Sequence, residues 1–381
     1  MNGKTLIIVI AGLLVLGLAV LNRPRRTVPV PPPEPTEPLS ARRVLKPRLP
    51  APRMAMEPPV AEPQADNARP TSLLTRLLDG DEAFTLSVLQ VESYLQDNRR
   101  SAESLLAAFR ATDDPALLRE AVERYPNDPR VNFAAYFGFR KESSPEDRRE
   151  RLEAFKQSAP DNALANYLSA QDHFNSGQTD QAVQELIAAA GKSKFQDYSG
   201  EFVQNAEEAY RAAGFSEADA KAVAAFGLPL PQLAELRRLG QNLGELATLY
   251  QQAGDEASAQ AAWQMGVNLG RQVGEPSGQN YLISDLVGLA IERQILERMD
   301  PASLYDSGGT TVSDRLEELA RRRDTYKEFQ GPVDASGHWS SATEVMESLS
   351  EQDRISFFDR IKVSGEIEAL RWARNRCSPD P

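Results

Sequence analysis

The sequence predicts an all-α fold, and three observations lead to that prediction. Beyond Pro70, no run of alternating β-branched residues marks a strand. Asp-Pro and Ser-Pro pairs recur there, and at four points such a pair is typical of the start of a helix. A set of small and bulky residues also returns at one fixed distance along the chain. Together these features indicate consecutive antiparallel helical hairpins.

Helix starts are the most local of these signals. The capping side chain accepts hydrogen bonds from free amides of the first turn, and a proline there has no amide to leave unsatisfied. Ser216 with Asp219 and Ser350 with Asp353 are weaker starts of a similar type. The four proline-containing pairs are Asp114-Pro115, Asp128-Pro129, Ser144-Pro145 and Asp300-Pro301. We therefore expect a helix to begin at each of these six points.

The repeated set consists of residues suited to a close crossing of two helices. Small side chains let paired helices approach, a bulky one fills the space beside them, and a glycine permits the turn between them. Ala170, Gly177, Ala182, Leu186 and Ala189 reappear 77 residues later as Ala247, Gly254, Ala259, Trp263 and Gly266. Pro126 and Pro160, 34 residues apart, mark a third and weaker register in which each proline ends a helix.

This arrangement resembles the tetratricopeptide repeat family, whose 34-residue helix-turn-helix units carry small, glycine, bulky and proline residues at comparable spacings. The resemblance covers residues 163–191 and 240–268, and more loosely 129–160. His173 stands where the family favours tyrosine, residues 192–239 do not keep the period, and "LPLPQ" at 228–232 interrupts the array. Generic α-hairpins with alanine-rich crossings are the alternative. Both interpretations give a TPR-like or superhelix-like body of antiparallel hairpins.

An apolar segment from Leu6 to Leu21 opens the chain, and we expect it to be a transmembrane anchor within residues 1–22. Its sixteen residues would rise about 24 Å as a helix, slightly short of a hydrocarbon core of about 30 Å, and flanking Lys4 and Arg23 can reach the headgroups. A cleaved signal peptide is the alternative. We expect a single-pass protein of a bacterial inner membrane, with the periplasmic and cytoplasmic orientations of the body both open.

Residues 23–70 predict a disordered, Pro-rich linker, because this segment holds fourteen of the 26 prolines. The first 70 residues carry ten Lys/Arg against five Asp/Glu, so their net charge is +5. Since the whole chain is −12, the remaining residues carry −17. An acidic body of this size disfavours nucleic-acid binding.

Residues 71–279 are expected to form the repeat domain and residues 280–381 a C-terminal helical region that caps it. In the second part, Tyr281–Met299 predicts one amphipathic helix, and Ser313–Phe329 predicts a charged one. "DSGGTT" at 306–311 and "GPVDASGHW" at 331–339 are breaks. Two or three further helices are expected up to Arg376.

Residues that carry chemistry are scarce. We expect His173 to be a packing residue and His338 an exposed loop residue, and the single cysteine, Cys377, excludes an internal disulfide. We find no catalytic motif and no metal-ligand spacing, so we expect no enzyme activity, no cofactor and no metal.

Superhelical arrays present a concave groove lined by the first helix of each hairpin, and aromatic residues beside arginines suit a peptide ligand. Phe133 and Phe137 suit the core equally well. The predicted partner-binding residues are Arg130, Phe133, Phe137, Arg140, Lys141, Tyr167, Gln171 and Phe174, followed by Thr248 and Gln251 on the second copy.

The sequence therefore predicts a membrane-tethered scaffold that holds a protein or peptide partner in a helical-repeat groove. An envelope enzyme with its active site in residues 280–381 is the alternative, and a structural subunit that only oligomerises is another.

Overall fold

All regular elements are α-helices in the computed structural model, which describes residues 85–140, 143–274, 281–306, 308–327 and 348–377. The all-α prediction is confirmed for these residues: two isolated bridges, Asn162 to Lys194 and Leu304 to Thr311, are the only β pairings among them. None of the helices described is both long and apolar enough to cross a membrane. The predicted anchor and linker, Lys141 and His338 lie outside the described residues.

Most of the connections between consecutive helices are short, and the one before Val312 is longer. In chain order they are α3 (Val88–Asp97), α4 (Ala102–Thr112), α5 (Pro115–Arg124), α6 (Pro129–Gly138), α7 (Pro145–Ser158), α8 (Ala163–Asn175), α9 (Thr179–Ala190), α10 (Ser199–Ala212), α11 (Glu217–Phe226), α12 (Pro231–Gln252), α13 (Glu256–Gly274), α14 (Leu282–Leu296), α15 (Val312–Lys327), α17 (Glu351–Ser364) and α18 (Glu366–Cys377).

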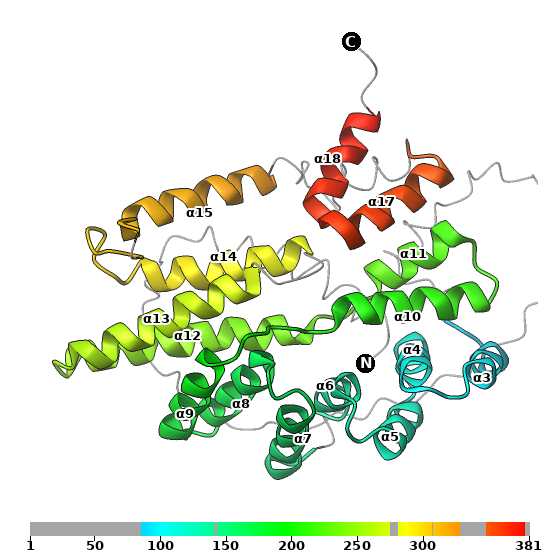
Figure 1. The fold of residues 1–381 in the computed structure, drawn as a ribbon, viewed down its shortest axis with the longest axis horizontal. Helices are drawn as coiled ribbons and strands as arrows, with labels where there is room; N and C mark the ends of the chain where they lie inside the picture. The colour runs from blue at the N-terminus through cyan, green and yellow to red at the C-terminus, as the bar shows by residue number, and fades with distance from the viewer. Residues whose placement is uncertain (1–84, 141–142, 275–280, 307, 328–347, 378–381) are drawn as a thin grey trace, which may run out of the picture.

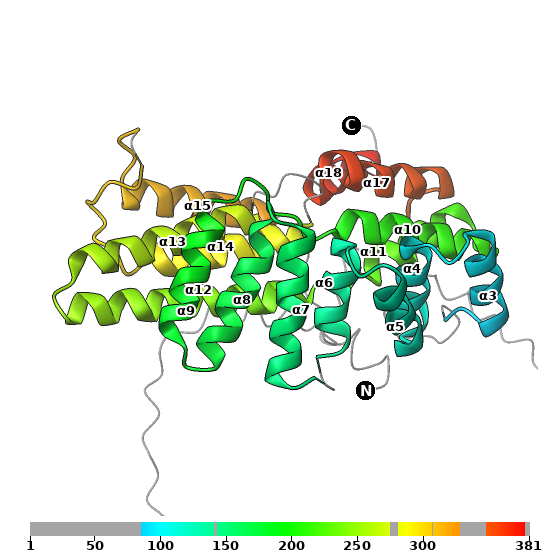
Figure 2. The ribbon, with the colours of Figure 1, turned by 60° about the horizontal axis from the view of Figure 1, so that its bottom comes forward.

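Two layers of helices make up most of the molecule. The first layer consists of α3 to α9, in which α4 pairs with α5, α6 with α7 and α8 with α9 (Figure 1). The second layer begins with the α10–α11 hairpin and continues with α12, α13 and α14. Helix α10 packs on α4, and α12 packs on α8. Figure 2 shows the second layer extending along the first, with α17 and α18 above α10 and α11. Consecutive helices therefore pair as hairpins, as the sequence predicted.

Five of the six predicted helix starts are confirmed. Asp114, Asp128 and Ser144 each accept a backbone amide hydrogen bond at a helix whose first turn contains a proline. Ser216 and Ser350 cap α11 and α17 in a similar manner. These caps satisfy amides that have no partner inside the helix, so each start is fixed by residues close together in the sequence.

The predicted start at Asp300 is wrong. The carboxylate of Asp300 accepts from the amide of Ala302 at 3.0 Å, but the residues that follow form a turn. The next helix begins only at Val312.

The turns at the two glycines of the 77-residue repeat have the same geometry. Gly177 has φ +70° and Gly254 has φ +78°, and a side chain at either position would meet open space. In both turns the amide after the glycine bonds to a carbonyl five residues earlier, at 2.9 Å in each case. This is the Schellman closure of a helix, which requires a left-handed residue, and glycine adopts that conformation without strain.

The side chains that recur at the same offset are buried. Leu186 and Trp263, the bulky residues, are 1% and 6% exposed. Gly266 faces Ile295 on α14. The alanines have no exposed surface at all: they are Ala170, Ala182 and Ala189 in the first copy, and Ala247 and Ala259 in the second. The repeated alanines are therefore fully buried, whereas Gly266 lies against α14.

Helix α14 differs from the amphipathic helix that was predicted. It is buried on most of its circumference, including the polar residues Ser284, Asp285 and Glu292. Gly288 lies so close to the backbone of Gly274 on α13 that a Cβ at Gly288 would be 2.4 Å from it. The predicted domain boundary at 279/280 thus falls between two tightly packed helices.

Candidate binding cavity between the two layers

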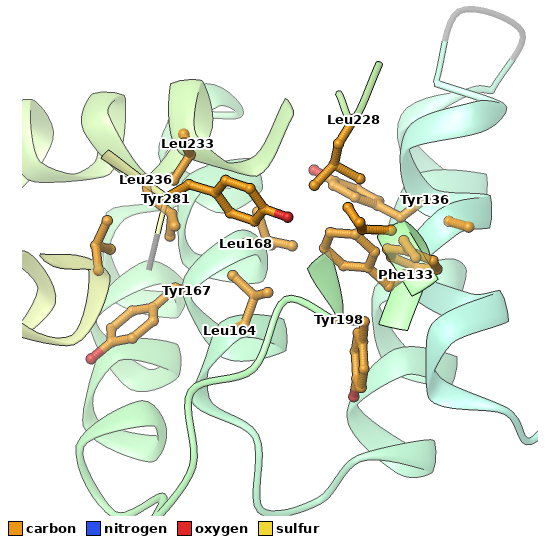
Figure 3. Close-up of a cluster of buried hydrophobic side chains, with 14 of the residues drawn as sticks. Phe133, Tyr136, Leu164, Tyr167, Leu168, Tyr198, Leu228, Leu233, Leu236 and Tyr281 are labelled. Carbon is orange, nitrogen blue, oxygen red and sulfur yellow. The ribbon is translucent and has the colours of Figure 1, made fainter. Parts of the chain in front are cut away.

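The predicted groove residues of the first layer lie mainly on α6 and α8, where α10 and α12 cover them. Phe133, Tyr167 and Gln171 are 3%, 3% and 2% exposed. Phe137 and Phe174 are partly buried against the same core. Figure 3 shows Phe133 near Tyr198, which belongs to the segment that leads into α10, and the two ring centroids are 6.0 Å apart. The face expected to form an open groove is therefore filled by later helices of the same chain.

Specific contacts join these residues to the second layer. The ring of Phe133 stacks on that of Phe202, with 6.0 Å between centroids. The hydroxyl of Tyr167 donates to a side-chain oxygen of α13 at 2.8 Å. Gln171 accepts from Asn242 on α12 at 3.1 Å. Three of the predicted partner-binding residues thus contact later helices of their own chain, which fill the predicted groove.

Arg140 makes a charged contact between the layers. Its guanidinium lies 2.7 Å from a carboxylate oxygen of Glu235, which is 3% exposed, and this hydrogen bond raises the pKa of Arg140. A buried carboxylate needs such a partner because it has lost its hydration. The two predicted groove residues on α12 lie elsewhere. Thr248 donates to a backbone carbonyl of its own helix, and Gln251 is exposed.

A cavity of about 440 Å³ remains where α10 and α12 begin. Its walls come from the segment before α10, the first turns of α10 and of α12, and single residues of α6, α13 and α14. Tyr198, Leu233 and the partly buried Phe195 add apolar surface, whereas Leu236 has no exposed surface. Figure 3 shows the two leucines and Tyr198 on separate sides of the cluster. The polar residues of the lining include Arg130, Asp197, Ser199, Glu201, Asn205 and Gln232.

Asn162 fixes the rim of this cavity. Its side chain donates to the carbonyl of Gln196 at 2.7 Å and accepts from the amide of Gln196 at 3.0 Å. The same oxygen also caps α8 through the amide of Leu164. Two residues after Gln196, Tyr198 takes the left-handed conformation with φ +58°, which is strained for a bulky residue. The loop is therefore held in one shape by a buried amide.

Two side-chain amides in the cavity wall each have one buried atom without a hydrogen-bond partner among the described residues. Asn205 is 8% exposed and Gln232 is 1% exposed. Within the described part of the chain, neither Nδ2 of Asn205 nor Oε1 of Gln232 has a hydrogen-bond partner. The amide orientation of Gln232 is defined, because its Nε2 donates to Asp197 at 2.7 Å. A buried polar group without a partner costs about 1–3 kcal/mol, which a bound ligand can recover.

The two kinds of charge in the wall differ in their partners. Arg130 is engaged by Asp128 at 2.5 Å, Glu103 at 2.7 Å and Glu201 at 3.4 Å, and its hydrogen bond with Asp128 raises the pKa of Arg130. Asp197 accepts from the amide of Ser199 and from Gln232, but it forms no ion pair with any Lys, Arg or His of the described residues. The cavity therefore holds a carboxylate whose hydrogen bonds come only from neutral groups.

Arg110 lies behind this wall. Its guanidinium is 3.7 Å from the ring centroid of Phe202, and burial lowers the pKa of Arg110 to about 10. The charge of Asp197 acts on that pKa in the opposite direction, although the two residues form no ion pair. The Nε of Arg110 is buried without a hydrogen-bond partner among the residues described. Stacking on Phe202 is thus its closest stabilising contact.

A second cavity, of about 310 Å³, lies between α14, α15 and α18. It contains Asp285, Tyr326 and Glu366, and burial raises the pKa of Glu366. A raised carboxyl pKa is typical of a general acid. Here Glu366 accepts from the first amide of α14, that of Leu282, at 2.8 Å, so its position is explained by helix capping.

The described residues contain no group of three His, Cys, Asp or Glu side chains arranged to hold a metal. His173, predicted to pack, is partly buried, and its Nδ1 lies 2.9 Å from the side-chain oxygen of Gln178 across the turn.

Asp197, Asn205 and Gln232 are not among the binding residues predicted from the sequence. They lie in residues 192–239, which do not keep the repeat period. No local signal distinguishes a glutamine that lines a cavity from one on a surface, since the distinction depends on how α10 and α12 meet.

A scan of this chain against protein-family models found no match, and searches against curated proteins and solved structures found none either.

Proposed function

We propose that this protein is a membrane-tethered scaffold that binds a protein partner at the cavity between its two helical layers. In this proposal the hairpins α6–α7, α8–α9 and α12–α13 are tetratricopeptide-like units, and Leu6–Leu21 is the anchor. The tether keeps the partner near the membrane and raises its local concentration.

One observation carries the proposal: later helices cover the inner face of α6 and α8, and an opening remains at the cavity. Among the described residues, its wall contains two amides with one unpartnered atom each and a carboxylate outside any ion pair, beside apolar side chains such as Leu233. Sites with a few convergent polar groups on an apolar wall are the usual form of a ligand pocket. Of the predicted groove residues that the structure describes, Arg130 alone lies in this wall.

Affinity capture of the full-length protein from crosslinked membranes tests this function. Gln204→Trp places a large side chain at the cavity wall, whereas Glu208→Trp places the same group one turn further along α10, outside the cavity. Both positions are exposed, so neither change disturbs the core. We expect a stoichiometric partner that is recovered with Glu208→Trp and lost with Gln204→Trp. Equal recovery with both variants refutes the cavity as the binding site.

The same capture experiment distinguishes the scaffold from the alternative, a structural subunit that only oligomerises. If the chain captures only further copies of itself, and Gln204→Trp does not change that, the protein oligomerises through another surface and the scaffold proposal fails.

A further inference from the structure

We propose that the cavity between the layers binds a main-chain segment that carries a basic side chain, arginine or lysine. This proposal rests on the proposed function and names the chemistry that the same site recognises. Three residues carry it: Asn205, Gln232 and Asp197.

The two unpartnered amide atoms match a peptide group. A peptide unit offers one donor, its N–H, and one acceptor, its C=O. Gln232 has an unpartnered acceptor, Oε1, and Asn205 an unpartnered donor, Nδ2, and both residues line the same cavity. Both atoms are buried in the wall, so a peptide group bonds to them once the two side chains turn toward the cavity. The amide of Asn205 turns about a soft torsion, so it adjusts to a ligand without moving the backbone. Leu233 and the partly buried Phe195 offer apolar surface beside them for the Cα atoms of the segment.

The charge of the wall selects among peptides. Asp197 has two hydrogen bonds but no ion pair in the described part of the chain, while Arg130 is already shared by three carboxylates. A basic side chain gains an ion pair with Asp197, whereas an acidic one meets Asp197 and Glu201. The net charge of −17 over residues 71–381, which is −12 less the +5 of the first 70, acts in the same direction at longer range.

Photocrosslinking of the full-length protein in detergent tests the proposal. The probes are two capped pentapeptides, acetyl-Gly-photoleucine-Arg-Gly-Gly-amide and the same peptide with glutamate in place of arginine. Crosslinked residues are identified by mass spectrometry. We expect the arginine peptide to label residues 195–205 and 232–236 about tenfold more strongly, the effect of one close charge pair in a partly solvated site.

Two variants test the main-chain contact and the preference for a basic side chain separately. Asn205→Leu removes a main-chain contact, so it should lower labelling by both peptides. It also removes an unpartnered buried amide, so the melting temperature should stay the same or rise. Asp197→Asn should abolish only the preference for arginine. Glu208→Gln, which changes an exposed carboxylate on α10 outside the cavity, is the control and should leave that preference unchanged.

Equal labelling by both peptides, labelling confined to other surfaces, or a preference that survives Asp197→Asn overturns the proposal. The proposed function is tested separately, by the capture experiment with Gln204→Trp and Glu208→Trp. If the membrane partner is still lost with Gln204→Trp, the scaffold stands with a different ligand chemistry. If Gln204→Trp and Glu208→Trp also recover the partner equally, both proposals fail.

Discussion

The hairpins α8–α9 and α12–α13 share their landmarks at a 77-residue offset but pack on their neighbours in different ways. In α8–α9 the crossing is made by alanines, and the outer face of α9 is open, with Ile187 52% exposed. In α12–α13 the crossing continues into a third helix, because Gly266, Gly270 and Gly274 receive α14. The same turn thus serves a two-helix unit in one layer and a three-helix unit in the other. A sequence repeat specifies the hairpin, and the residues outside the repeat specify what covers it.

The largest effect is expected from filling the alanine crossing. Ala182 is fully buried between α8 and α9, so Ala182→Trp should destabilise the protein by about 3 kcal/mol or more, at or above the upper end of the 1–3 kcal/mol typical of overpacked cores. Thermal unfolding followed by circular dichroism should show a fall of at least about 6 °C. Ala259→Trp, its counterpart in the second hairpin, should behave alike. Ile187→Trp, on the same helix but exposed, is the control, and an unchanged melting temperature for Ala182→Trp would contradict the crossing.

The glycine contact that distinguishes the second hairpin comes next. A Cβ at Gly288 would lie 2.4 Å from the backbone of Gly274, and backbone atoms cannot turn aside as a side chain can. We expect Gly288→Ala to cost about 2 kcal/mol despite the better helix propensity of alanine. Gly191→Ala at the end of α9 should be neutral in thermal unfolding, because its nearest neighbour would be 3.7 Å away and its φ is negative. Equal stability of the two variants would remove the distinction between the hairpins.

The same two hairpins show which features of the fold can be predicted from the sequence and which cannot. Gly177, Gly254 and the capped Asp-Pro starts were predictable because a turn or a cap is determined by residues within a few positions of each other. The cover over α6 and α8 was not predictable, since it depends on residues such as Phe202 that contact Phe133 across 69 positions. Asp300-Pro301 shows the limit even of a local signal, because no amphipathic segment follows it closely enough to form a helix.

The charged contact between the layers gives the third effect. Arg140→Glu brings two carboxylates together at Glu235, which is 3% exposed. The cost should be about 2 kcal/mol, below the 3–5 kcal/mol of a fully buried pair, because Arg140 keeps part of its surface in solvent.

The matched control for this contact is Arg238→Glu. Arg238 pairs with the same oxygen of Glu235 at 2.8 Å, but it does so from within α12 and is 58% exposed. Chemical denaturation should show the smaller loss for Arg238→Glu, since a solvated pair adds little stability. Equal losses would mean that the contact between the layers adds no stability of its own.

The repeated turn provides a smaller effect and the most direct test of the 77-residue offset. Gly177→Ala and Gly254→Ala each force alanine into the left-handed region, and neither introduces a clash. Each should therefore cost about 1 kcal/mol. The two losses, measured by thermal unfolding, should agree. A clear difference between them would show that the two turns are not equivalent.

The smallest effect concerns an ion pair of the first layer and depends on pH. Hydrogen bonds from Arg100 lower the pKa of Glu120 to about 2, from an ordinary value of 4.5. Because the folded-state pKa is depressed, this stabilisation is present above about pH 4.5 and is lost as the pH falls towards 2. The Glu120 side chain is 28% exposed, so solvent screening reduces the contribution to about 0.5–1 kcal/mol. Glu120→Gln should lower the melting temperature at pH 7 and leave it nearly unchanged near pH 2. Glu123→Gln, an exposed position on the same helix, should change it at neither pH, and a Glu120→Gln loss that is independent of pH would contradict the role of the ion pair.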